Sequence, residues 1–303
     1  MTYAFDPELA PWVAMLPKTD LTDIAATRAQ VAEMLAQLPK PPVPDTLSIE
    51  DTTTNGVPVR IYRPTGRPGP LPALLNLHGG GFVFGDLEFA HAESVRIATE
   101  VEAVVVSVDY RLAPEHPFPA GLEDCYTALG WTVDNAGDLG IDPARVGVGG
   151  ESAGGGLAAS VAQLARARGG PALRFQYLGI PELDDSLETV SMRTFVDTPL
   201  WNRPAAEISW KSYLTGETTL DGVPAAPARA EDLSGLPPAF VSTSEFDPLR
   251  DEGLAYAQRL LQAGVSVELH HYPGTFHGSV MVADAAVTRR MIRDAIEALR
   301  RSL

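Results

Sequence analysis

A serine in a glycine-rich turn is the first residue of this chain that could do covalent chemistry. Ser152 stands in "GESAG" at 150–154, between the apolar run "RVGVGG" and an alanine-rich helical pattern. At such a strand–turn–helix corner a serine can act as a nucleophile, because the sharp turn exposes its hydroxyl and the flanking glycines lack bulk. The start of the helix also directs N–H groups and the positive end of the helix dipole at developing negative charge. The alternative is a tight turn that contains a serine by chance.

A serine hydroxyl becomes a good nucleophile only when a base takes its proton and an acid orients that base. Among the six histidines, His277 lies in "YPGTFHGSV", a glycine-flanked loop after the last predicted strand, from which it can reach the carboxyl edge of a sheet. His270 and His271 fall within that strand, His91 in a helical pattern and His116 in a proline-rich turn. We therefore predict that His277 is the base.

The orienting acid is expected between the serine and the histidine in the chain, at the end of another strand. The segment "VSTSEFDPLRDEG" supplies Glu245, Asp247, Asp251 and Glu252. Asp247 precedes a proline, which holds it in extended or turn geometry. Asp251 and Glu252 fall in the first turn of a predicted helix, where acids stabilise the helix dipole. We predict Asp247 as the acid, with Glu245 as the alternative.

Three consecutive glycines in "LHGGGFVFG" at 77–85 follow a predicted strand. A phosphate-binding loop would need a lysine followed by serine or threonine, and a dinucleotide loop would need a helix that begins on the glycines; neither pattern is met. The remaining functional interpretation is an oxyanion hole, in which backbone N–H groups stabilise a negatively charged oxygen. We predict donors at Gly80, Gly81 and Ala153, with Gly79 as the competing position. His78 is predicted to hold the loop by hydrogen bonds.

The chain alternates between short apolar runs and helical patterns, with glycines and prolines between them. Such alternation predicts a parallel sheet that helices cover on both faces. The predicted strands are 57–64, 73–79, 103–110, 145–150, 172–180, 238–245 and 265–272. The predicted helices are 90–101, 121–135, 154–168, 251–263 and 283–301. No internal repeat divides the chain, and we predict a single α/β domain over residues 1–303.

Two segments interrupt this alternation. Residues 1–45 look helical, and residues 184–232 carry aromatic side chains among prolines. We predict that both form a cap, or lid, over the edge of the sheet where the strands end, because parallel sheets bind ligands there. Phe82 of the glycine loop, together with Trp201 and Trp210 of the second segment, is predicted to line an apolar substrate pocket.

The composition excludes several classes of partner and site. The 39 acidic and 23 basic residues give a net charge of −16, which opposes binding to nucleic acid and to anionic membranes. The single cysteine, Cys125, excludes internal disulfides and cysteine-based zinc sites, and its surroundings predict a buried, inert thiol. The first residues lack the pattern of a signal peptide, and no apolar run is long enough to cross a membrane. We therefore expect a cytoplasmic protein without a membrane anchor.

Taken together, the motifs resemble those of the hormone-sensitive-lipase-like carboxylesterases, a family with the α/β-hydrolase fold. The resemblance rests on "HGGGF" (78–82), "DYRLAPEHPFPA" (109–120), "GESAGG" (150–155), "DPLRDEG" (247–253) and "HG" (277–278). It implies a mostly parallel sheet of about eight strands with helices on both faces and a helical cap. It also implies a catalytic triad of Ser152, Asp247 and His277, the oxyanion donors named above, and no cofactor or metal.

Two positions depart from the family pattern. Glu151 stands where the family more often has aspartate, and Ser279 where it tends to have phenylalanine. The first keeps a carboxyl group and predicts altered contacts behind the serine, and the second bears on the packing behind His277. The segment "YRLAPEHPFPA" is predicted to be a structural turn in which Arg111 pairs with Glu115.

These features predict a serine carboxylesterase that hydrolyses small esters with short-to-medium acyl chains through an acyl-enzyme on Ser152. The same site can act on amides, as an arylformamidase-like or peptidase-like enzyme, if the histidine protonates the leaving amine. The fold can also serve as a small-molecule receptor, but a receptor has no reason to keep Ser152, Asp247 and His277 together. The oligomeric state is left open, with a homodimer as one option.

Overall fold

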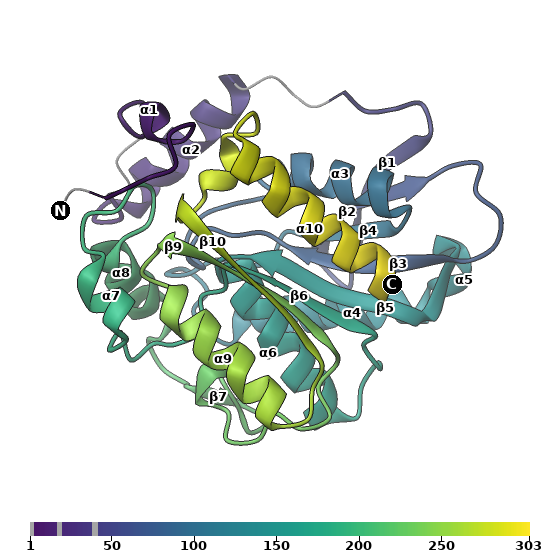
Figure 1. Ribbon diagram of the computed structural model, residues 1–303. Coiled ribbons are helices and arrows are strands. Elements are labelled where there is room, and N and C mark those ends of the chain that lie inside the picture. Colours follow the sequence, from purple (N-terminus) through teal and green to yellow (C-terminus); the bar gives the residue numbers. More distant parts are fainter. Residues whose placement is uncertain (1–2, 17–19, 38–41) are drawn as a thin grey trace.

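The computed structural model describes residues 3–16, 20–37 and 42–303. At its centre lies an eight-stranded sheet in the order β1-β2-β4-β3-β5-β6-β9-β10 (Figure 1). The strands are β1 (Leu47–Thr54), β2 (Val57–Pro64), β3 (Leu71–Leu77), β4 (Val104–Val108), β5 (Ile141–Glu151), β6 (Phe175–Gly179), β9 (Ala239–Phe246) and β10 (Val267–Phe276). β2 is antiparallel to both its neighbours, β1 and β4, and all other neighbours are parallel. The parallel strands therefore end at one common edge.

Helices cover both faces of this sheet (Figure 1). The covering helices are α3 (His91–Val101) and α10 (Ala286–Ser302) on one face, and α4 (Ala120–Asp134), α6 (Ala153–Arg168) and α9 (Arg250–Gln262) on the other, with the short α5 (Ala136–Leu139) before β5. Val105 packs in the core beneath α3 and α10, and its neighbour Val106 packs in the core beneath α4, α6 and α9. Successive strand residues face opposite sides, so a strand buried on both sides is mainly apolar. In β4 all residues except Ser107 are valines.

The remaining helices gather beside the edge where the parallel strands end (Figure 1). They are α1 (Ala10–Val13), α2 (Ile24–Gln37), α7 (Val190–Thr194) and α8 (Arg203–Tyr213). The side chains of Thr189 and Asn202 accept N–H groups at the starts of α7 and α8, which is why these helices begin there. A two-stranded ribbon, β7 (Thr219–Leu220) and β8 (Val223–Pro224), and a 3-10 turn at Pro227–Arg229 lead the chain back toward β9.

The predicted fold class is confirmed, and every predicted strand and helix is present with its ends shifted by a few residues. β1 was not predicted, because only its two terminal residues are buried and the rest of "LSIEDTTT" is polar enough to resemble a loop. The helical character expected at the start of the chain is found in α1 and α2. Of the segment 1–45, residues 1–2, 17–19 and 38–41 lie outside the described residues.

The Arg111–Glu115 pair predicted for the turn after β4 is wrong. Arg111 instead donates two hydrogen bonds of 2.8 Å to the carboxylate of Asp124 in α4. Glu115 accepts two hydrogen bonds, of 2.8 and 2.9 Å, from Arg28 in α2. In both cases the partner therefore lies on another element and not within the turn. Cys125, next to Asp124, is buried as predicted.

Arg28 connects α2 to the segment after the glycine loop. Its Nε donates to the carbonyl oxygen of Val83 at 2.7 Å, and its Nη2 donates to that of Ala113 at 2.8 Å. A guanidinium presents its donors in a fixed planar fork, so one side chain holds two backbone segments in register. The helix α2 is thus attached to the loop that follows β3.

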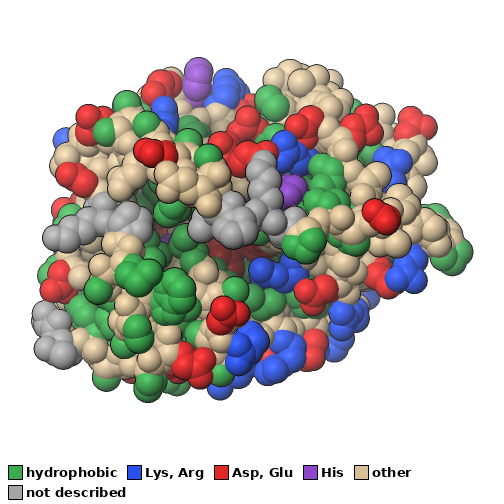
Figure 2. Space-filling view, turned by 90° about the horizontal axis from the view of Figure 1, so that it is seen from above, with side chains coloured by type: hydrophobic (Ala, Val, Ile, Leu, Met, Phe, Trp, Pro, Cys, Tyr) green, Lys and Arg blue, Asp and Glu red, His purple; other side chains and the backbone are tan. Residues whose placement is uncertain are grey.

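The surface carries charges of both signs. Figure 2 shows acidic and basic side chains mixed over much of the face seen from above, with hydrophobic side chains gathered at the left of that face. In the described ranges, no helix combines the length and the apolar character that crossing a membrane requires.

Gly154, at the start of α6, has no room for a side chain. A Cβ there would lie 1.9 Å from the carbonyl oxygen of Leu77 in β3, and a backbone atom cannot rotate away. We predict that Gly154→Ala lowers the free energy of unfolding by at least about 1–3 kcal/mol, the usual cost of overpacking a core. Urea unfolding measures the change.

The matched control is Gly130→Ala in α4, where nothing lies within 4 Å of the added methyl group. Alanine is the better helix former, so this variant should gain up to about 1 kcal/mol. Equal stabilities of the two variants would contradict the close approach of α6 to β3.

Candidate active site

Ser152 occupies the sharp turn between β5 and α6. Its backbone has φ 59° and ψ −124°, a conformation that is rare for a residue with a side chain. The Ser152 N–H donates to the carbonyl oxygen of Gly179 at 2.8 Å, and its own carbonyl oxygen accepts the N–H groups of Gly156 and Glu182 at 3.0 Å each. These bonds hold the strained turn in place, and strain that surrounding structure maintains is characteristic of functional sites.

The structure brings Ser152, Asp247 and His277 together from three different strand ends. His277 Nε2 lies 2.9 Å from Ser152 Oγ, and His277 Nδ1 lies 2.8 Å from Asp247 Oδ2. With its proton on Nδ1, the imidazole donates to the carboxylate and leaves Nε2 free to accept the serine proton. Asp247 is only 1% exposed, so little water competes for this bond. Such an arrangement can deprotonate the hydroxyl as its oxygen attacks an electrophile.

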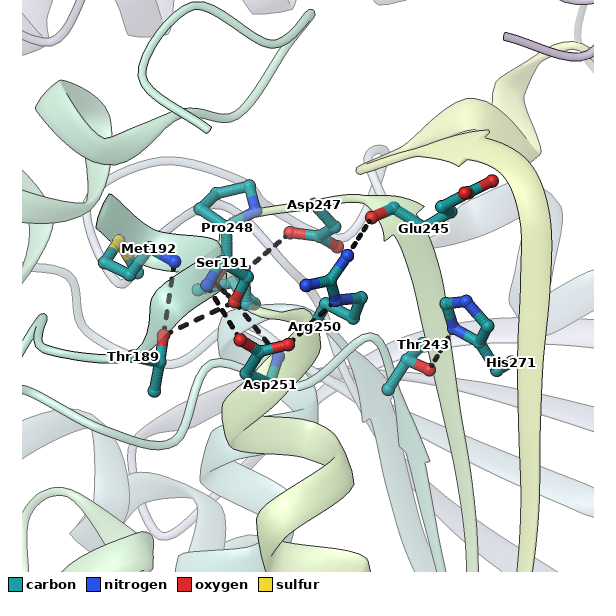
Figure 3. A network of polar contacts seen from close by, with 11 residues as sticks. Thr189, Ser191, Met192, Thr243, Glu245, Asp247, Pro248, Arg250, Asp251 and His271 are labelled. Atoms are coloured by element: carbon teal, nitrogen blue, oxygen red, sulfur yellow. Dashed lines mark hydrogen bonds and ion pairs between the residues drawn. The ribbon is translucent and has the colours of Figure 1, made fainter. Parts of the chain in front are cut away.

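Figure 3 shows that the side chains of Asp247 and Glu245, the two acids considered for this role, point in different directions. Asp247 accepts the N–H of Leu249 through Oδ1 at 2.9 Å, which leaves Oδ2 for the histidine. The side chain of Glu245 points away from Asp247 and accepts the N–H of Gly274 at 2.6 Å. Of these two carboxylates, it is Asp247 that contacts the imidazole.

A polar network joins the loop of Asp247 to α7 (Figure 3). Ser191 in α7 donates its Oγ–H to the carbonyl oxygen of Pro248 and its N–H to Asp251 Oδ2, both at 2.8 Å. Arg250 donates to Asp251 Oδ1 at 2.8 Å and to the carbonyl oxygen of Glu245 at 3.0 Å. The position of the acid therefore depends on a helix of segment 184–232.

The glycine loop lies directly beside the serine. A Cβ on Gly79 would be 3.4 Å from Ser152 Cβ, and Gly80 and Gly81 have φ values of 119° and 54°, which glycine adopts readily. Within the described part of the chain, no backbone hydrogen bond occupies the N–H of Gly80 or Gly81. Ala153 is the first residue of α6, so its N–H has no partner within the helix. These three N–H groups can therefore donate hydrogen bonds to an oxygen atom that is bound next to the serine.

His78 holds the loop as the sequence suggested. Its Nδ1 lies 2.7 Å from the carbonyl oxygen of Gly79, and its ring stacks on that of Tyr110 with centroids 4.1 Å apart. Burial lowers the pKa of His78 to about 4. The ring is therefore neutral at pH 7, and Nδ1–H donates to the carbonyl oxygen.

Among the three predicted pocket aromatics, Trp201 contacts the groups around the serine. Its ring centroid lies 5.8 Å from that of His277, and its Cη2 would be 2.3 Å from a Cβ on Gly81. Phe82 and Trp210 have ring centroids 5.2 Å apart and are each 3% exposed. Phe82 also stacks on the ring of Tyr213, with centroids 4.2 Å apart.

Glu151, directly before the serine, belongs to a pair of half-buried carboxyl groups that the sequence did not reveal. It lines a small cavity together with Glu93 of α3. Tyr177 donates its hydroxyl to Glu151 at 3.2 Å, and Asn76 donates to Glu93 at 3.4 Å. Burial, and then the charge of Glu151, raises the pKa of Glu93 to about 8, and burial also raises that of Glu151. The described residues include no group of three or more side chains suited to a metal ion.

Ser279 is buried in the 3-10 turn Ser279–Met281 that follows His277. Thr288 of α10 donates its hydroxyl to the carbonyl oxygen of Ser279 at 3.3 Å. The turn that follows the histidine is thus attached to α10, with a serine where the family tends to have phenylalanine.

Comparisons with known proteins agree with this architecture. A family profile described as the α/β-hydrolase fold matches residues 74–281. The carboxylesterase NlhH of Mycobacterium tuberculosis is 43% identical over 290 residues, which cover 91% of this chain and 90% of that protein. An arylesterase of Saccharolobus solfataricus is 36% identical over 288 residues, with coverages of 90% and 91%. The solved structure of a bacterial heroin esterase superposes with a TM-score of 0.92 at 50% identity and covers 99% of this chain and 98% of its own.

The pair of half-buried carboxyl groups makes stability depend on pH. Because the pKa of Glu93 rises from 4.5 to about 8 on folding, the folded state binds more protons than the unfolded state between these values. The free energy of unfolding must then fall as the pH rises through this range. We predict that Glu93→Gln, which cannot ionise, weakens the fall by at most about 1.4 kcal/mol per pH unit.

Urea unfolding at a series of pH values measures this effect. Glu297→Gln, at an exposed position of α10, is the control and should follow the wild type. An identical pH dependence in the wild type and Glu93→Gln would show that Glu93 ionises freely in the folded protein.

Proposed function

The chain belongs to the α/β-hydrolase family, in its hormone-sensitive-lipase-like branch, and from this we propose that it is a serine carboxylesterase acting on small esters. The observation that carries the proposal is the hydrogen-bonded series from Ser152 through His277 to Asp247, with free N–H groups of the glycine loop beside it. A small-molecule receptor would need no such alignment. The relatives named carboxylesterase and arylesterase support the same reaction class.

In the proposed mechanism His277 Nε2 takes the Ser152 proton while Oγ attacks the ester carbonyl carbon. The carbonyl oxygen becomes negatively charged and accepts the N–H groups of Gly80, Gly81 and Ala153. The protonated His277, stabilised by the carboxylate next to it, donates its proton to the leaving alcohol, and the acyl group stays on the serine. A water molecule then repeats the sequence, which releases the acid and restores the hydroxyl.

The substrate site is proposed to lie under a cap formed by segments 1–45 and 184–232. Helices of both segments gather at the edge where the proposed catalytic residues meet. Trp201 forms the wall next to His277, and Phe82 and Trp210 support that wall from behind. An apolar wall of this kind suits acyl chains of short to medium length, because it gains contact area with each methylene group.

A cytoplasmic location also belongs to the proposal, while the oligomeric state stays open, with a homodimer as one option. The single buried thiol, which can form no internal disulfide, suits a reducing compartment. Cell fractionation tests the location, and light scattering measures the oligomeric state.

Removal of the proposed nucleophile should abolish turnover. We predict that Ser152→Ala lowers kcat on aryl esters by about 10⁶-fold, as loss of the serine does in other triad enzymes. A series of acyl-chain lengths should give the highest kcat/KM for short to medium chains. Equal hydrolysis by the wild type and Ser152→Ala would reject the assignment, and a preference for the amide over the ester of the same acyl group would make the protein an amidase.

Neutralising the acid should impair turnover without moving the backbone. Asp247→Asn is expected to lower kcat by about 10⁴-fold, because an amide in this place favours the wrong tautomer of His277. Glu245→Gln is the matched control and should stay within a few-fold of the wild type, since its side chain contacts Gly274 and not the imidazole. Steady-state kinetics at pH 7 compare the two, and a larger loss in Glu245→Gln would reverse the choice of acid.

A further inference from the structure

Glu182 lies behind the proposed active site and has no role in the mechanism above. It follows β6 in "IPELDD" and is fully buried. Its backbone N–H donates to the carbonyl oxygen of Ser152 at 3.0 Å. Its side-chain Oε1 lies 3.2 Å from Ser209 Oγ in α8. One buried acid thus touches the turn of the serine through its backbone and a cap helix through its side chain.

The contacts of Ser209 show which group must donate each proton. Ser209 Oγ lies 2.7 Å from the carbonyl oxygen of Gly81, which can only accept a hydrogen bond. A hydroxyl has one proton, so that proton is directed to Gly81. The contact with Glu182 can then be a hydrogen bond only if the proton comes from the carboxyl group. Glu182 therefore fits this geometry as a neutral carboxylic acid.

We propose that Glu182, as a neutral acid, is a positioning residue for the oxyanion hole: it donates to Ser209, whose hydroxyl donates to the Gly81 carbonyl and so holds the glycine loop against the serine. The proposal rests on the esterase function proposed above. When the carboxyl group loses its proton, the resulting carboxylate attracts the Ser209 hydroxyl proton. The Gly81 carbonyl then loses its donor, and the loop loses the contact that fixes it to α8.

The surroundings of Glu182 favour the neutral form. The ionisable groups around it are Asp247 in the acid loop, Glu252 in α9, and the phenols of Tyr110 and Tyr213; none of these is a cation. Burial, and then the negative charge of Asp247, raises the pKa of Glu182 to about 8. Oε2 is buried and has no hydrogen-bond partner among the described residues, so an ionised carboxylate would leave it unsatisfied.

The test is the pH dependence of kcat in four proteins: the wild type, Glu182→Gln, Ser209→Ala and Glu93→Gln. In the wild type, kcat should fall by roughly 10-fold above the pKa of Glu182, less than the roughly 10²–10³-fold loss of a whole oxyanion donor, with KM nearly unchanged. Glu182→Gln keeps a donor that cannot ionise, so its kcat should not fall in this range. Ser209→Ala removes the hydroxyl that links Glu182 to the Gly81 carbonyl oxygen. Its kcat should be lower than that of the wild type at every pH and should not fall further at alkaline pH.

Glu93→Gln is the matched control, because Glu93 is also an acid with a pKa of about 8 but contacts neither Ser209 nor Gly81. It should keep the alkaline fall of the wild type. An alkaline fall that persists in Glu182→Gln, or that disappears in Glu93→Gln, overturns the proposal.

Infrared spectroscopy gives a readout that needs no substrate. The carbonyl band of a protonated carboxylic acid should be present at pH 7, decrease as the pH passes about 8, and lose intensity at pH 7 in Glu182→Gln. The absence of any difference between the wild type and Glu182→Gln would show that Glu182 is ionised. If the band behaves as expected but no ester is hydrolysed, the proposed function fails and the protonation of Glu182 stands.

Discussion

The close contact between the start of α6 and the end of β3 determines where every other part of the site lies. Cβ atoms on Gly150 and Gly154 would be 2.1 and 1.9 Å from the carbonyl oxygen of Leu77. The turn that carries Ser152 therefore touches the strand that leads into the glycine loop, main chain against main chain. Because atoms in a protein interior are already close-packed, no rearrangement of neighbouring side chains can replace this contact. The serine and the proposed oxyanion donors are adjacent for this reason.

Residues at strand ends could be predicted from the sequence because parallel strands share one carboxyl edge. That rule was enough to choose Asp247 and His277 as partners of the serine, and the structure places both side chains within hydrogen-bond distance of one another. The rule says nothing about contacts between the sheet and helices such as α8. Glu182 and Ser209 are far apart in the sequence and carry no spacing that would connect them. Side chains that can reach several elements, such as Arg111, were equally beyond prediction.

The carboxyl groups behind the serine have raised pKa values, and this has an electrostatic consequence. Glu151 precedes the serine in the chain, and the backbone N–H of Glu182 donates to the carbonyl oxygen of Ser152. A negative charge at either position would oppose the negative charge that develops on the substrate oxygen, and in a buried site such repulsion is weakly screened. Burial raises the pKa of both acids. Burial therefore weakens the tendency of both carboxyl groups to add negative charge beside the turn.

The attachment of Arg28 to the backbone after the glycine loop bears on how such enzymes can diversify. One side chain of α2 binds the carbonyl oxygens of Val83 and Ala113 and the carboxylate of Glu115. Val83 lies two residues beyond Gly81, so α2 is bonded directly to the end of the glycine loop. If an N-terminal segment were exchanged between relatives, the residue at position 28 of the new segment would determine how the backbone after the glycine loop is held. Of these acceptors only Glu115 is a side chain, so a hybrid chain keeps the full set of contacts only when Arg28 and Glu115 are inherited together.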